Sequence, residues 1–95
     1  MPRYITLIRF TEQGARNIKQ STARARAFAE VVAKAGVKVE AQYWTSGRYD
    51  GALVLSADSE RKVLHAITEL AAAGNLRSET LQAFDAKEFE AIVGG

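Results

Sequence analysis

The sequence predicts an α+β fold in which a four-stranded antiparallel sheet carries two helices on one face. Three observations support this prediction. The chain has 95 residues, the size of one domain. Segments with strand and helix patterns follow one another in the order β-α-β-β-α-β, with a short helix at the end. No linker, repeat or low-complexity tract separates them, so we expect a single domain over residues 1–95.

The first strand and helix are predicted from residue type and spacing. Tyr4–Phe10 is rich in β-branched and aromatic residues, which is typical of a strand. A short helical turn is expected at Ala15–Lys19. A longer helix is expected to start from a cap at Ser21 or Thr22 and to end near Ala35. Its apolar face has helical spacing and consists of Phe28, Val31, Val32 and Ala35.

The second and third strands are predicted to form a hairpin. Apolar and polar residues alternate along Val37–Trp44, which predicts a half-buried strand at or near a sheet edge. Ser46-Gly47-Arg48 is predicted to be a tight turn, with Gly47 at a positive φ. Tyr49–Ala57 follows as the third strand. One face of the second strand is expected to carry Val37, Val39, Ala41 and Tyr43.

The remaining elements complete a recognisable order. Asp58 or Ser59 is expected to cap a second helix that ends near Ala73, and Leu76–Phe84 is expected to form the fourth strand. Asp85 and Glu88 have the spacing of a capping box, which predicts a short C-terminal helix at Ala86–Val93. Together the elements predict a ferredoxin-like fold.

Two strands are apolar on both faces. In the first strand Ile5 and Leu7 alternate with Tyr4, Ile8 and Phe10, and in the third Leu53 and Leu55 alternate with Ala52 and Val54. Two helices cover only one face of such a sheet, and an exposed apolar face marks an interaction surface. We therefore expect a homodimer or larger homo-oligomer. The alternative is that the C-terminal helix folds over the second face through Phe89, Ile92 and Val93.

Several short motifs resemble those of the GYD family. They are Gly47-Arg48-Tyr49-Asp50, Thr11-Glu12-Gln13-Gly14 with Asn17, and Gly74-Asn75-Leu76-Arg77 leading to Thr80–Phe84. The resemblance covers nearly the whole chain. It implies a relation to ferredoxin-like proteins that pair as dimeric α/β barrels, in a family of unestablished biochemical function. The chain departs from the pattern at Ser56 and Asp58, where relatives tend to have an acidic residue and then a proline.

Composition argues against several kinds of chemistry. Without cysteine there is no disulfide or thiolate, and the single histidine, His65, is predicted to face solvent on the second helix. Zinc and copper sites and a serine-histidine triad are therefore not expected. No glycine pattern typical of a nucleotide phosphate loop is present. We expect no cofactor, no membrane partner and, because no leader-like or membrane-spanning apolar segment is found, a cytoplasmic location.

Charge gives little support to nucleic-acid binding. The formal net charge is +2, although residues 1–34 contain seven Lys or Arg against two Glu. We interpret this basic excess as a solvated helix face. The segment Tyr49–Leu55 has aliphatic residues where an RNA-binding strand of this fold would have aromatic residues, so no nucleic-acid partner is expected.

The hairpin is the best candidate site, because turns on a rigid scaffold often carry function. Asp50 is the best candidate for a catalytic acid or base, but it could instead accept backbone N–H groups of Ser46–Arg48 or pair with an arginine. Trp44 and Tyr49 could hold a flat ligand or pack across the strands. Neighbouring strands carry Arg9 and Arg77, which could bind a carboxylate ligand or pair with Glu79 or Asp50.

These residues support three functional hypotheses. The first is a small homo-oligomeric binding module whose pocket lies between sheet and helices, or between subunits, near Trp44, Tyr49 and Asp50. The second is a cofactor-free enzyme acting on an aromatic or activated carbonyl substrate. In that case Asp50 would transfer a proton and Arg9 or Arg77 would orient the substrate. The third is a structural assembly unit.

Overall fold

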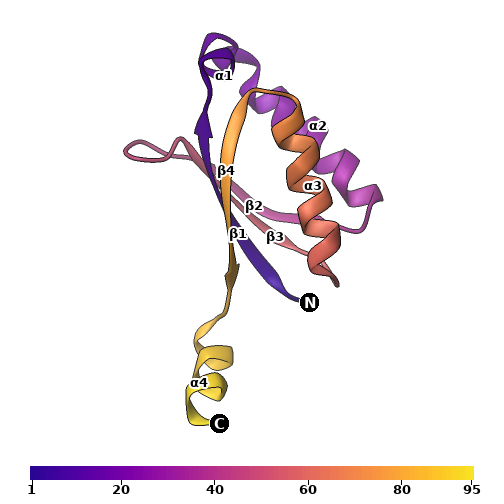
Figure 1. The fold of residues 1–95 in the computed structure, drawn as a ribbon, viewed down its shortest axis with the longest axis vertical. Coiled ribbons are helices and arrows are strands. Elements are labelled where there is room, and N and C mark those ends of the chain that lie inside the picture. Colours follow the sequence, from indigo (N-terminus) through magenta and orange to yellow (C-terminus); the bar gives the residue numbers. More distant parts are fainter.

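The computed structural model describes residues 1–95 and contains one four-stranded sheet, four α-helices and a short 3-10 turn (Figure 1). The observed order confirms the predicted β-α-β-β-α-β sequence of elements with a terminal helix. The elements are β1 (Arg3–Phe10), α1 (Glu12–Arg16), η1 (Ile18–Gln20), α2 (Ser21–Lys34), β2 (Lys38–Trp44), β3 (Gly51–Ser56), α3 (Glu60–Ala72), β4 (Leu76–Ala83) and α4 (Ala86–Gly94).

The sheet has the strand order β2-β3-β1-β4, and all neighbouring strands are antiparallel. The predicted edge position of β2 is therefore confirmed, and β4 forms the other edge. Helices α2 and α3 lie side by side over the same face of the sheet (Figure 1). At the centre of the sheet, Ile5 of β1 pairs with Val54 on one side and Leu81 on the other.

The hydrophobic core fills the space between the sheet and these two helices. From the sheet, Tyr4, Ile8, Leu53 and Leu55 point into it, all buried. From the helices and the segments that flank them come Val32, Val37, Ala57, Val63 and Ala66. Thr6 is also fully buried on this face, and its hydroxyl forms a 3.0 Å hydrogen bond with that of Thr80 on β4. The core is thus confined to the helix-covered face.

The other face, which we call the open face, is apolar and has no cover from its own chain. It carries the half-buried Ile5, Leu7 and Val54 together with Leu81, which is 45% exposed. The predicted two-sided apolarity of β1 and β3 is therefore confirmed. The alternative, that the C-terminal helix covers this face, is wrong: α4 extends beyond the end of the sheet (Figure 1), and its Phe89 is 57% exposed.

A short connection and a local cap explain why α4 does not fold back. Only Phe84 and Asp85 separate β4 from α4. The predicted capping box of Asp85 and Glu88 is present and starts the helix immediately. Both carboxylates also lie close to Arg3 at the start of β1, with N–O distances of 3.8 and 3.5 Å. These contacts fix the start of α4 beyond the edge of the open face.

The first helical region differs from the prediction in its bounds and in one cap. The predicted turn Ala15–Lys19 is helical but is divided between α1 and η1. Helix α1 begins earlier, at Glu12, because Thr11 acts as its cap by accepting the N–H of Gly14. The long helix has Gln20 at its N-cap, with no side-chain cap. Ser21 does not cap it, because Ser21 is already helical, with φ −57° and ψ −44°; its hydroxyl accepts a hydrogen bond from Trp44. The prediction that Ser59 could cap the second long helix is confirmed.

The predicted alternation of β2 is interrupted by a β-bulge. The register with β3 shifts between Val39 and Ala41. Val39 pairs with the buried Leu55 and packs against the core, whereas Ala41 pairs with Val54 and therefore lies on the open face. The prediction that Val37, Val39, Ala41 and Tyr43 share one face is wrong for this reason.

Candidate functional site

The connection between β2 and β3 is a six-residue loop, Thr45–Asp50, instead of the predicted tight turn. Thr45 closes the loop at its base: its N–H donates to the Asp50 carbonyl at 2.9 Å, and its hydroxyl donates to the Tyr49 carbonyl at 2.6 Å. The third strand consequently starts at Gly51 and not at Tyr49. The prediction for Gly47 is confirmed, since its φ is +117°.

Asp50 joins this loop to the end of β1. Its carboxylate accepts the backbone N–H of Phe10 at 2.8 Å, and its own N–H donates to the carbonyl of Ile8 at 2.7 Å. The predicted partners, which were the Ser46–Arg48 N–H groups or an arginine, are wrong. The carboxylate nevertheless binds a backbone N–H group, as the structural interpretation of Asp50 expected. It satisfies this donor at the point where the pairing of β1 with β3 ends.

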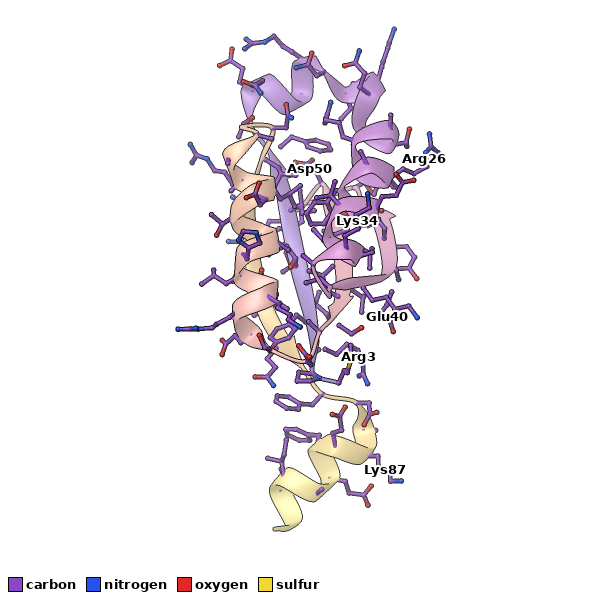
Figure 2. The ribbon with its side chains drawn as sticks, turned by 90° about the vertical axis from the view of Figure 1, so that its right-hand side faces the viewer. Arg3, Arg26, Lys34, Glu40, Asp50 and Lys87 are labelled. Carbon is purple, nitrogen blue, oxygen red and sulfur yellow. The ribbon has the colours of Figure 1, made fainter.

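A cavity of about 350 Å³ lies between the sheet, α2 and α3. Its walls are mainly apolar and include Ile8, Phe28, Leu53, Leu70 and Leu76. Trp44 and Asp50 lie at its border, and the indole N–H of Trp44 donates to the Ser21 hydroxyl at 2.9 Å. In Figure 2, Asp50 is seen in the gap between α2 and α3. An apolar wall with a few polar groups is typical of a small-molecule site.

A second, shallower depression of about 240 Å³ lies on the open face at the Phe10 end of β1. We call its three guanidinium groups the arginine cluster: Arg9, Arg48 and Arg77. The predicted proximity of Arg9 and Arg77 is confirmed, since they pair directly across β1 and β4. The Tyr49 ring belongs to this cluster, with its centroid 5.2 Å from the Arg9 guanidinium and 5.9 Å from that of Arg48.

The arginine cluster has no carboxylate partner of its own. The ion pairs of the chain do not include Arg9, Arg48 or Arg77, so the predicted pairs with Glu79 or Asp50 are not formed. The Glu79 carboxylate accepts the Tyr49 hydroxyl at 3.2 Å instead. Three guanidinium groups and the single Glu79 carboxylate line the depression, so its net charge is positive and favours an anionic ligand.

The predicted site residues thus form two separate sites on opposite sides of the sheet. Trp44 and Asp50 border the cavity on the helix-covered side, whereas Tyr49 joins Arg9 and Arg77 on the open face. Trp44 and Tyr49 therefore line different depressions, and the structure does not bring them together as a clamp. Asp50 and the two arginines also fail to converge, which leaves the enzymatic hypothesis without its expected geometry.

Sequence reasoning missed a polar junction between the start of α1 and the end of α3. The Thr11 hydroxyl donates to the Gly74 carbonyl at 2.6 Å, and the Gln13 amide donates to Asn75 Oδ1 at 3.1 Å. A Cβ on Gly14 would collide with the carbonyl oxygen of Asn75. The signal was present in the sequence, because these residues belong to the motif pieces Thr11–Gly14 and Gly74–Arg77.

The three motif pieces meet around the end of β1. Asp50 binds the N–H of Phe10, and the next N–H, of Thr11, donates to the Asn75 carbonyl at 3.1 Å.

His65 lies on the exposed side of α3, as predicted, 3.9 Å from Glu69. No three His, Asp or Glu side chains gather in a way that could hold a metal ion. None of the helices has the length and apolarity required to cross a membrane.

These motif residues belong to a known family. The sequence profile of the GYD domain matches residues 4–93. The chain is a member of the GYD domain family.

The chain is also similar to two proteins from Thermus thermophilus. The glutamine synthetase and cystathionine beta-lyase binding protein is 33% identical over 84 residues, which cover 87% of this chain and 88% of that protein. The crystal structure of TTHA0845 has a TM-score of 0.57 with this chain at 24% identity, covering 90% of this chain and 96% of the other. The second comparison supports the fold alone.

Proposed function

We propose that this protein is a homo-oligomeric binding module in which two ferredoxin-like domains pair through their open faces to form a dimeric α/β barrel. The observation that carries the proposal is the apolar open face. Ile5, Leu7, Val54 and Leu81 form a continuous apolar surface across three strands, and α4 leads away from it. A soluble protein seldom leaves such a surface in water unless it binds something.

A second copy suits this surface well. Two sheets that pack face to face bury their inner side chains at a spacing of about 10 Å, which β-branched and leucine side chains fill. A stable interface removes about 800 Å² from each partner. At roughly 25 cal/mol per Å² of apolar area, even part of that burial would offset the entropy lost on association.

We further propose that the assembled module binds other proteins or small molecules and catalyses no reaction. The name of the Thermus relative states that it binds two enzymes, and likeness to it supports a protein-binding role here. The apolar cavity beside Trp44 supports an apolar or aromatic small-molecule ligand. Asp50 is the candidate catalytic acid or base of the enzymatic hypothesis. Its hydrogen bond to a backbone N–H supports a structural role instead. A reducing, cytoplasmic compartment suits a chain without cysteine.

A matched pair of substitutions tests the pairing surface. Leu81 on the open face and Leu64 on α3 are both exposed leucines, at 45% and 65%. Leu81→Lys places a charge within the proposed interface and should yield monomers in sedimentation velocity. Leu64→Lys makes the same change away from it and should leave dimers. Equal behaviour of the two variants would contradict the open-face proposal.

A further inference from the structure

Helix α4 has an apolar stripe that its own chain does not cover. The stripe consists of Phe89, Ile92 and Val93, all more than half exposed. At 100° per residue, Glu88 and Glu90 flank Phe89 at about 100° on either side, and Lys87 lies about 160° away. Figure 2 shows Lys87 projecting to one side of the isolated α4. The helix therefore offers an apolar stripe between two carboxylates. Glu88 also accepts the Asp85 N–H and lies 3.5 Å from Arg3 of its own chain, whereas Glu90 has no partner in its own chain.

The arginine cluster offers the complementary pattern. Leu7 and the Tyr49 ring provide apolar surface, and Arg9, Arg48 and Arg77 surround it without a carboxylate partner. If the open face is covered by a second copy, as proposed above, these charges lose water. Glu79 lines the same depression and balances one of the three charges. Burying the remaining guanidinium groups is costly unless the second copy supplies anions at this place.

Two limiting directions of the two-fold axis can be compared. In a face-to-face dimer the two-fold axis lies between the sheets, parallel to them. An axis along the strands would place one arginine cluster against the other, with six guanidinium groups together. An axis across the strands reverses the second copy and places each cluster over the partner's opposite end, where β4 leads into α4. Figure 1 shows that α4 and the Phe10 end of β1 lie at opposite ends of the molecule.

We infer that α4 of each subunit docks on the arginine cluster of the other. The inference rests on the proposed pairing through the open faces. In this arrangement Phe89, Ile92 and Val93 contact Leu7 and Tyr49, and the two glutamates lie against the guanidinium groups. The exchange of α4 explains why a helix with an exposed apolar stripe stands free of its own domain, and it fixes the sheets in an antiparallel orientation.

Charge reversal on either side tests this contact. Arg9→Glu/Arg77→Glu makes the cluster acidic. Glu88→Gln/Glu90→Lys changes the net charge of Asp85–Gly94 from −2 to +1. Glutamine at the third helical position keeps the capping box. Each variant alone should weaken dimerisation by about 100-fold. Arg26→Glu/Lys34→Glu on α2, with the same change of charge as the arginine variant but away from the open face, should have no such effect.

Mixing the two variants gives the decisive result. In the mixed dimer an acidic cluster meets a basic α4, and the other contact is that of the wild type. The mixture should therefore form heterodimers with nearly wild-type affinity, measured by sedimentation of differently labelled chains. If each variant dimerises like the wild type, or if mixing fails to restore affinity, the α4 contact is wrong while open-face pairing stands. A wild type that stays monomeric would instead refute the pairing on which the contact rests.

Discussion

Replacement of Asp50 separates a structural aspartate from a catalytic one. Its carboxylate accepts the N–H of the half-buried Phe10 at 2.8 Å, where β1 leaves the sheet. In Asp50→Asn the amide oxygen can still accept this hydrogen bond, but the charge is lost. In Asp50→Ala the acceptor is removed, and the Phe10 N–H remains without its partner.

The geometry predicts a graded loss of stability. A hydrogen bond to a charged group contributes about 1.5–3 kcal/mol and a neutral one about 0.5–1.5 kcal/mol, so Asp50→Asn should cost about 1 kcal/mol. A donor left unsatisfied costs about 1–3 kcal/mol, so Asp50→Ala should cost about 2 kcal/mol. For a domain of this size these values correspond to falls in Tm of about 5 °C and 10 °C.

Thermal unfolding at neutral pH provides the measurement, with protein concentration held fixed because oligomers gain stability from association. Asp58→Asn is the matched control. Its carboxylate forms a surface ion pair with Lys62 at 2.9 Å, and such pairs contribute less than about 1 kcal/mol. A catalytic carboxylate is often a burden on stability. An Asp50→Asn protein that is more stable than the wild type would refute the structural interpretation and restore the enzymatic hypothesis.

Three further predictions follow from local geometry. Gly47→Val should lower the free energy of unfolding by about 1–3 kcal/mol through backbone strain alone, because φ is +117° and nothing lies near the added Cβ. Gly47→Asn should lower it less, and equal melting curves for the two variants would contradict this prediction. Gly14→Ala should lower stability by about 3 kcal/mol in chemical denaturation through collision with Asn75, whereas Gly94→Ala, which has open space, should not. Trp44 is the single tryptophan and borders the cavity, so an apolar naphthalene probe that enters the cavity should quench its fluorescence. Ala25 also lines the cavity, so Ala25→Phe should lower the affinity for the probe. An unchanged fluorescence signal would exclude ligand entry there.

The sequence was informative where structure depends on neighbours in the chain. The caps at Ser59 and Asp85 and the positive φ of Gly47 arise within a few residues, so local patterns were sufficient. The apolarity of β1 on both faces was equally visible, because it follows from alternation alone. The position of α4 was not visible, since helical pattern does not say where a terminal helix docks.

The errors in the candidate site come from contacts between distant segments. Asp50 was expected to bind its own hairpin, but its partner Phe10 is 40 residues away. The bulge after Val39 and the bond between Trp44 and Ser21 likewise depend on how β2 meets β3 and α2. The proximity of Arg9 and Arg77 was predicted correctly, because the fold makes their two strands neighbours. The position of Tyr49 could not be predicted in this way, because Tyr49 lies in a loop.

Sedimentation equilibrium of the wild-type protein tests the central claim most directly. The open face is proposed to be a pairing surface, so across micromolar concentrations the mass should approach twice the 10.4 kDa of one chain and fall towards that value on dilution. A mass of one chain at every concentration, from protein that is folded and melts cooperatively, would contradict the claim.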